Sequence, residues 1–400
     1  MQFNTNKILT SIFFYGMVLV PGLLMVLNDK VGSNFIGIFF ISTIILFLVV
    51  ISGFNKLTIS YSFLIFSVIS FFLILFHFGL SSLLFQNGNT TFTKNITSLL
   101  FLFYILLACY FSSVAIDNIT HQEFDRIVSK LFKLLIALGV LSSLFILSSS
   151  STSKEMLFFT EPSHYALIVT IFYCYKISQK KLNLLYGIPL LFTALIVQNL
   201  TLIIGIVVAI AINYMRVKSM FIIMICVSSS CMLIAGILPI DKLSYYSQRL
   251  DISQESKNTS TLTLLSGYEQ AYLALRDSYG LGYGLQNMGY ANERGEFVSI
   301  IGRLRGGNTD SNLYDGGLFI SKLIVEFGIL GGIFFLYTLF LGVMRFKCND
   351  KKIKFFSIVL IMSIIYFLLR GSGYFTPSAV MIFISIIYLV NKKNINKKMT

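Results

Sequence analysis

The amino-acid sequence predicts an all-α polytopic membrane protein with about 12 transmembrane helices. Hydrophobic residues make up 56% of the 400 residues and charged residues only 12%, and the mean hydropathy is +0.81. This composition excludes a soluble globular domain. Apolar runs of about 20 residues, the length of a helix that crosses a ~30 Å hydrocarbon core, recur along the chain. The long polar interruption is residues 239–316, with seven basic and nine acidic side chains.

The first apolar run, residues 8–28, is predicted to be a retained span, because it is too long for a signal-peptide core and lacks a small-residue cleavage site. Residues 182–214 are ambiguous, since they could form one long helix or a hairpin that turns at Gln198-Asn199. With the hairpin, the predicted spans are 8–28, 34–53, 61–80, 96–116, 131–149, 162–177, 182–197, 200–214, 219–238, 317–344, 354–370 and 374–391.

The positions of lysine and arginine favour the hairpin, and therefore twelve spans rather than eleven. Cytoplasmic loops of membrane proteins are enriched in these residues. One long helix over 182–214 would separate the basic clusters at 176–181 and 216–218, whereas a hairpin places both in the cytoplasm with the basic tail 392–398. Both termini are then cytoplasmic, and the loop 239–316, between spans 9 and 10, lies on the outer face. The short outer loops hold Lys30, Lys94, Lys154 and Arg370.

The net charge of +14 follows largely from this cytoplasmic bias. We expect no nucleic-acid partner, because the basic residues lie at helix ends rather than in one stripe. Residues 1–400 are expected to form one membrane domain, with the loop folded over its outer face. No cofactor is expected, and neither metal-ligand spacing nor a disulfide framework follows from the cysteines, which lie in or beside apolar runs. They are Cys109, Cys174, Cys226, Cys231 and Cys348.

Within the loop, the sequence predicts an amphipathic helix over about 260–279, followed by a glycine-rich turn. Glu269 and Arg276, seven residues apart, share one face of this helix. Gly280 should end the helix, and Gly-Leu-Gly-Tyr-Gly at 280–284 should let the backbone approach a ligand closely. The apolar residues that recur at spacings of three and four are Leu264, Leu265, Tyr268, Tyr272 and Leu275.

Two arginines near the end of the loop form a candidate phosphate site. Arg303 and Arg305 precede Gly306-Gly307, and in an extended backbone their side chains would lie on the same side. The planar guanidinium group binds phosphate in a bidentate manner, which suits this pair. In the alternative interpretation, the arginines are solvated or contact lipid headgroups.

A second candidate site is Thr-Glu-Pro-Ser-His at 160–164, on the outer side at the start of a span. Proline suits a helix start, and Glu161 would lie near the positive end of the helix dipole. In one interpretation this is only a capped helix with a satisfied histidine. In the other, Glu161 or His164 handles a proton of an acceptor hydroxyl. Of the three histidines, His77 is expected mid-span and His121 in the cytoplasm, which leaves His164 for outer-face chemistry.

Lys322 and Glu326 lie four residues apart in the predicted span 317–344. Ionisable groups inside a span face the bundle interior or a cavity rather than lipid. Either they serve a function there, or they simply pair with each other across one helical turn.

Three short motifs, taken in order along the chain, resemble a known family. They are Thr-Glu-Pro-Ser-His-Tyr-Ala at 160–166, Gly-Leu-Gly-Tyr-Gly at 280–284, and Asp315-Gly-Gly-Leu followed by Glu326-Phe-Gly-Ile-Leu-Gly331. With many spans and one large outer loop in the second half, the chain resembles the bacterial O-antigen polymerases (Wzy type), which are related to the O-antigen ligases. Arg305 and Gly316 also match an Arg-x10-Gly pattern of some members.

The resemblance implies inverting glycosyl transfer without a metal at the periplasmic face of the inner membrane. A hydroxyl of one undecaprenyl-pyrophosphate-linked oligosaccharide attacks the anomeric carbon of another, and the lipid pyrophosphate leaves. Arginines would neutralise the diphosphate, and a carboxylate or histidine would serve the acceptor. The implied site residues are Glu161, His164 and Asp310 for catalysis, Arg276, Arg303 and Arg305 for pyrophosphate, and Glu269, Lys322 and Glu326 in support.

One departure from the related ligases concerns the proton acceptor. The ligases carry a histidine beside an asparagine just before the last large span, whereas this chain has Asp310-Ser311-Asn312. Asp310 is therefore a candidate base, and the departure argues against a ligase. An O-antigen ligase nevertheless stays one alternative. A flippase or secondary transporter is the other, although it should show polar residues along a midplane pathway and related halves. Membrane lipids and a chain-length regulator protein are the other candidate partners.

Overall fold

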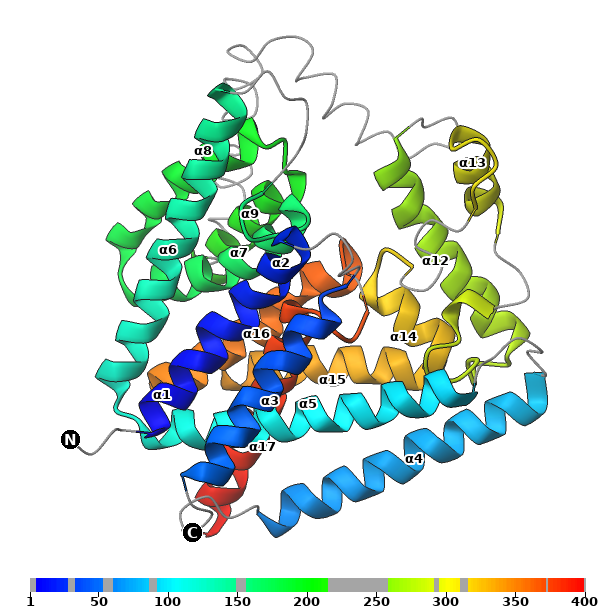
Figure 1. The fold of residues 1–400 in the computed structure, drawn as a ribbon, viewed down its shortest axis with the longest axis horizontal. Helices are drawn as coiled ribbons and strands as arrows, with labels where there is room; N and C mark the ends of the chain where they lie inside the picture. The colour runs from blue at the N-terminus through cyan, green and yellow to red at the C-terminus, as the bar shows by residue number, and fades with distance from the viewer. Residues whose placement is uncertain are drawn as a thin grey trace.

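The computed structural model of the protein describes residues 5–27, 33–52, 60–85, 92–148, 156–214, 258–290, 295–309, 316–371 and 373–398. Regular structure in these ranges is helical, apart from an isolated bridge between Met156 and Phe159 (Figure 1). The all-α prediction is confirmed for this part of the chain. The predicted span 219–238 and the first residues of the loop, 239–257, lie outside the described residues. The total of twelve spans therefore stays a prediction.

The first half of the chain follows the predicted spans closely. Its helical elements are α1 (Thr5–Ser11), the π-helical η1 (Ile12–Gly16), α2 (Met17–Leu27), α3 (Phe35–Ile51), α4 (Tyr61–Phe85), α5 (Phe92–Asn118), α6 (His121–Ser148), α7 (Pro162–Gln179), η3 (Lys181–Tyr186), α8 (Gly187–Ile196) and α9 (Leu200–Tyr214). The stretch 182–214 is a hairpin, as the charge distribution predicts. Gln198 adopts a left-handed conformation (φ +56°) between α8 and α9. The Asn199 side chain then accepts a hydrogen bond from the Leu202 backbone N–H at 3.2 Å.

Among its described residues, the second half contains the α-helices α12 (Thr259–Asp277) and α13 (Glu296–Leu304) of the loop and then the last spans. Its other elements are η4 (Met288–Tyr290), α14 (Phe319–Phe327), α15 (Ile329–Phe346), α16 (Lys351–Leu368) and α17 (Pro377–Lys398). The predicted single span 317–344 is wrong, because the chain breaks at Gly328 (φ +57°) between α14 and α15. A Cβ atom at this position would overlap the carbonyl oxygen of Gly280, so only glycine fits.

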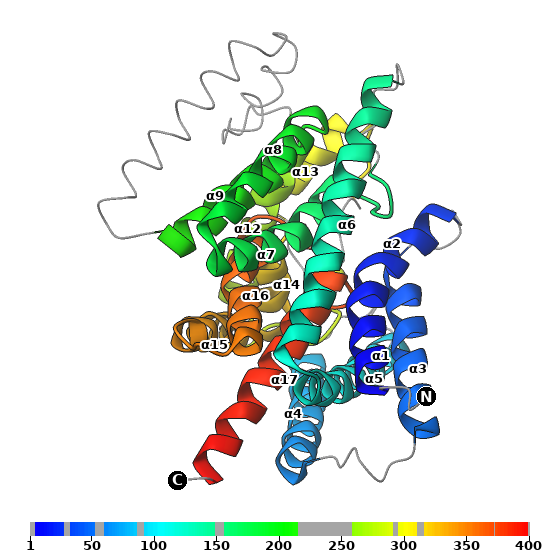
Figure 2. The same ribbon diagram turned by 90° about the vertical axis from the view of Figure 1, so that its left-hand side faces the viewer.

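Figures 1 and 2 show how the helices are arranged. In Figure 1, α6 to α9 lie on one side, α12 and α13 lie on the other, and α4 and α5 run along a third edge. Helices α7, α16 and α17 are the most buried. Aromatic rings join η1, α6, α7 and α16 in the core: the Phe355 ring lies 5.6 Å from Phe14, 5.5 Å from Phe124 and 5.1 Å from Tyr175, edge to face in each case.

Large apolar side chains on α4 and α15 face outward and are exposed. An extensive exposed apolar surface on an all-helical protein is typical of contact with lipid. Among the described residues, five stretches are long and apolar enough to cross a membrane: Thr5–Leu27, Phe63–Phe85, Phe92–Asn118, His121–Ser148 and Ile329–Phe346. Shorter apolar helices are Phe35–Ile51, Lys181–Ile196, Leu200–Tyr214 and Pro377–Lys392. The protein is therefore built for a membrane.

Helix α12 confirms the helix predicted in the loop, but it buries a different face. Tyr268 and Tyr272 are exposed, while small and polar residues such as Thr261, Ser266 and Ala274 are buried. The reason is the close approach of α14 and the residues before it: a Cβ on Gly267 would lie 2.6 Å from the carbonyl oxygen of Gly316. The tight contact requires small side chains, so the tyrosines face away from it.

Candidate functional site

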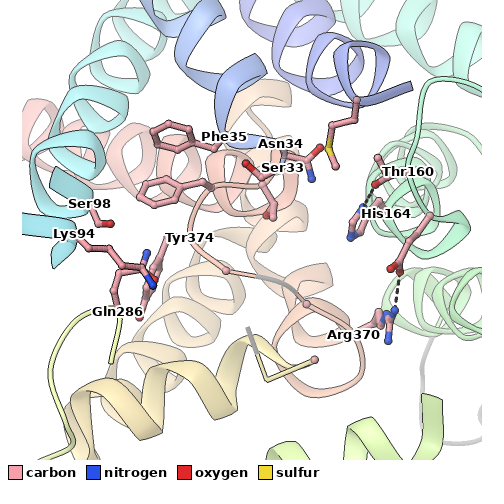
Figure 3. A pocket seen from close by; sticks show the side chains of 17 residues that line it. Ser33, Asn34, Phe35, Lys94, Ser98, Thr160, His164, Gln286, Arg370 and Tyr374 are labelled. Atoms are coloured by element: carbon pink, nitrogen blue, oxygen red, sulfur yellow. Dashed lines mark hydrogen bonds and ion pairs between the residues drawn. The ribbon is translucent and has the colours of Figure 1, made fainter. Parts of the chain in front are cut away.

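A polar pocket of about 640 Å³ lies among the starts of α3 and α5, the segment before α7, and the connection from α16 to α17. Figure 3 shows its lining side chains. The charged and polar ones include Asn34, Lys94, Ser98, Thr160, Glu161, His164, Gln286, Arg370 and Tyr374. The pocket therefore joins residues that lie more than 200 positions apart along the chain, such as Glu161 and Arg370.

Glu161 forms an ion pair with Arg370 at the edge of this pocket. The Arg370 guanidinium donates to Glu161 Oε2 at 2.6 Å, and the Ser163 hydroxyl donates to the same oxygen at 2.9 Å. Burial by itself would raise the pKa of Glu161. The positive charge of Arg370, the neighbouring His164 and these hydrogen bonds outweigh burial and lower the pKa of Glu161 to about 2. Glu161 is therefore a poor proton acceptor, and its role is to hold Arg370.

His164 lies in the first turn of α7 and lines the pocket (Figure 3). Its Nδ1 is 3.0 Å from the Thr160 hydroxyl, which fixes the orientation of the ring. Pro162 occupies the first turn of α7, so the predicted helix start is confirmed, although the Glu161 side chain does not cap it. Imidazole is the side chain best suited to exchange a proton near neutral pH. Of the two proton-handling candidates in this motif, His164 is the better one.

Lys322 and Glu326 pair with each other in the interior, as one of the two interpretations expected. Lys322 Nζ lies 3.0 Å from Glu326 Oε1, and the two side chains are 1% and 0% exposed. The Tyr374 hydroxyl donates to Glu326 Oε2 at 2.6 Å. Lys322 Nζ also donates to Gln286 Oε1 at 3.3 Å. Since Gln286 and Tyr374 both line the pocket, the buried pair supports its wall.

The glycine-rich turn at 280–284 closely approaches a helix break. The backbone N–H groups of Tyr283 and Gly284 donate to the carbonyls of Val325 and Glu326 at 2.9 and 2.8 Å. In return, the Ile329 N–H donates to Gly280 at 2.9 Å. The close approach expected of these glycines is therefore real, but its partner is the junction of α14 and α15.

Glu269 has a structural role in the loop. Its carboxylate accepts hydrogen bonds from the backbone N–H groups of Glu296 and Phe297 at 2.8 and 3.0 Å, which satisfies the start of α13. Arg276, on the same helix as Glu269, pairs with its neighbour Asp277 at 2.7 Å, with half of its side chain exposed.

The proposed same-side geometry of Arg303 and Arg305 is wrong, because the backbone is helical rather than extended. Arg303 lies in the last turn of α13 and Arg305 follows its end directly. Residues two apart on a helix lie about 200° apart around its axis. Neither these two arginines nor Arg276 lines the pocket. Asp310 lies outside the described residues.

The pocket instead contains two cations that the sequence did not single out, Lys94 and Arg370. The sequence identified both only as basic residues of short outer loops, and this was the one available signal. Figure 3 shows Lys94, Ser98, Gln286 and Tyr374 toward one end of the pocket, and Thr160, His164 and Arg370 toward the other.

A second cavity, of about 330 Å³, lies between α4, α5, α15 and α17. Apolar side chains form most of its wall, among them Phe66, Leu106, Phe334 and Ile387. We call it the apolar groove. Tyr374 lines both the groove and the polar pocket, and Leu285 lines the groove while the next residue, Gln286, lines the pocket. The two cavities are therefore neighbours.

These features define an all-α membrane protein with a charged pocket that borders an apolar groove. In comparisons of the chain with protein-family models, with curated proteins and with solved structures, nothing matches.

Proposed function

We propose that the protein is an O-antigen polymerase, which joins undecaprenyl-pyrophosphate-linked oligosaccharide repeat units at the periplasmic face of the bacterial inner membrane. The observation that carries this proposal is the charged pocket beside the apolar groove, with Tyr374 in the wall of both. A lipid-linked substrate has a charged head and an apolar tail, and each of these neighbouring cavities suits one of them. The resemblance of the motifs to the polymerase family adds to this support.

The chemistry follows from the groups in the pocket. A bond forms between the acceptor oxygen and the anomeric carbon, the bond from that carbon to the pyrophosphate breaks, and the acceptor proton moves to His164. Lys94 offsets the negative charge that develops on the leaving group. Holding the two substrates together contributes most of the acceleration, and a general base contributes about 10²–10⁴-fold.

The predicted orientation also gains support from two contacts with the helix ends that flank the short connection between α5 and α6. Lys7, near the N-terminus, lies 3.8 Å from Glu123, and Lys392, near the C-terminus, lies 2.5 Å from Asp117. Both ends of the described chain thus approach the same short connector. This supports termini on one side of the membrane and an even number of spans.

The test is a bacterial strain that lacks the protein, with its surface glycan separated by chain length on a gel. Single repeat units on lipid A would support a polymerase, whereas complete loss of surface glycan would point to a ligase or a flippase. His164→Ala should reduce polymer formation by about 10²–10⁴-fold at an unchanged protein level. His121→Ala is the matched control, because that histidine is exposed and belongs to the predicted cytoplasmic face. Full-length polymer from His164→Ala would exclude this residue as the base.

A further inference from the structure

The orientation of the Gln286 amide follows from the residue that it contacts. Lys322 carries an ammonium group, which can only donate hydrogen bonds. The Gln286 atom that faces Lys322 Nζ at 3.3 Å must therefore be the oxygen. This leaves Nε2, with its two N–H donors, for the pocket that Gln286 lines. Among the described residues, no hydrogen bond engages this nitrogen.

The backbone around Gln286 is held in an uncommon conformation. Gln286 has a φ of +62°, a region that non-glycine residues adopt rarely because it strains the backbone. The next residue, Asn287, stabilises this backbone conformation through two hydrogen bonds of its side chain. Its Nδ2 donates to the Tyr283 carbonyl at 2.7 Å, and its Oδ1 accepts from Asn95 Nδ2 at 2.9 Å. Asn95 is adjacent to Lys94 on α5, so the same contacts place Lys94 and Gln286 relative to each other.

The Lys322 side chain has little freedom to release Gln286. It is almost fully buried, pairs with Glu326, and lies 5.4 Å from the centre of the Tyr374 ring. Tyr374 in turn donates its hydroxyl to Glu326. The buried pair therefore fixes which atom of Gln286 the pocket receives.

We propose that the Lys94 ammonium and the Gln286 amide N–H form the subsite for the donor diphosphate, and that Lys322 is a positioning residue that orients Gln286. This inference rests on the proposed function and assigns one end of the pocket to the donor and the other end to the acceptor. The apolar groove borders this end through Tyr374 and Leu285, so the tail of a lipid diphosphate that is bound here has a place in the groove. His164 and Arg370 lie toward the other end, which is left for the acceptor.

Binding of farnesyl diphosphate to the purified protein in detergent, measured by calorimetry, tests the subsite. Gln286→Glu retains the oxygen that Lys322 needs but replaces the N–H donors with a second carboxylate oxygen. We expect about 10- to 100-fold weaker binding of farnesyl diphosphate. Gln198→Glu is the matched control, because Gln198 is also left-handed and half-buried but belongs to the α8–α9 turn. Equal affinity of Gln286→Glu and the unchanged protein would overturn the subsite.

Two further probes separate the head from the tail. Inorganic pyrophosphate should bind less tightly than farnesyl diphosphate, but Gln286→Glu should weaken its binding by the same factor. Farnesol should bind the unchanged protein and Gln286→Glu with equal affinity. A farnesol affinity that falls with the diphosphate affinity would indicate a general loss of structure and overturn the proposal. The outcome is independent of the polymerase assignment: a strain without the protein that still makes full-length polymer would refute the function, while diphosphate binding would still report on the subsite.

A double-mutant cycle tests the positioning role of Lys322. Lys322→Met is combined with Glu326→Leu, so that no unpaired charge stays buried. If Lys322 acts through Gln286, this double substitution should weaken diphosphate binding several-fold when Gln286 is present. It should have little effect in the Gln286→Ala background. Equal effects in both backgrounds would show a purely structural role and overturn this part of the proposal.

Discussion

The buried pair between Lys322 and Glu326 predicts an unusual order of stability among its variants. Their side chains are 1% and 0% exposed and 3.0 Å apart. Lys322→Met leaves the Glu326 carboxylate buried with Tyr374 as its hydrogen-bond donor. Removing one partner of a buried pair costs about 3–5 kcal/mol, whereas replacing both with apolar residues of similar volume is often neutral or stabilising by about 1–4 kcal/mol. The double variant Lys322→Met, Glu326→Leu should therefore be more stable than Lys322→Met alone.

Thermal unfolding of the purified variants in one detergent measures this order. Lys347→Met is the control for the loss of one lysine, because Lys347 is exposed at the end of α15 and its change should stay within about 0.5 kcal/mol. The expected sequence of melting temperatures is Lys347→Met near the unchanged protein, the double variant near or above it, and Lys322→Met clearly below. A double variant that melts at or below Lys322→Met would refute the reasoning, since it would show that the pair itself is strongly stabilising.

Three other predictions concern the pocket and its surroundings. Because the pKa of Glu161 is lowered to about 2, its contribution to stability should be complete above about pH 4.5 and disappear as the pH falls through 2; Glu161→Gln should remove this part of the acid transition in pH-dependent unfolding. Gly328→Ala should destabilise the protein far more than Gly332→Ala, which meets open space, and equal melting temperatures would contradict the helix-break geometry. Arg303→Ala and Arg305→Ala should leave the polymer ladder unchanged on a gel, because neither lines the pocket, and a shortened ladder would restore them to the site.

Much of the helical architecture could be predicted from the sequence, because the thickness of a bilayer sets the length of an apolar helix. The hairpin at Gln198-Asn199 was predictable from charge, since each basic cluster has to lie on a definite side of the membrane. The break at Gly328 was not. A glycine within an apolar run has no fixed conformation of its own, and its φ of +57° is imposed by Gly280, which lies in a different element.

The motif at 160–164 could be predicted as part of the site, but the distant residues that it contacts could not. Glu161 and His164 were recognisable from local sequence, because they lie three residues apart at a helix start. Arg370 pairs with Glu161 across 209 positions, and no local pattern carries that information. The prediction for Arg303 and Arg305 is wrong for the opposite reason. A shared side depended on an extended backbone, and a nine-residue helix at this point changes the direction of both side chains.

The contact between the glycine-rich turn and the junction of α14 and α15 has a consequence for chimeric proteins. The turn supplies N–H groups to carbonyls at the end of α14, and the start of α15 returns one to the turn. A loop transplanted from another protein without its own junction would leave these groups unpaired beside the membrane core. Residues 280–284 and 325–329 should therefore be exchanged together, as one cassette, although some 40 residues separate them in the chain.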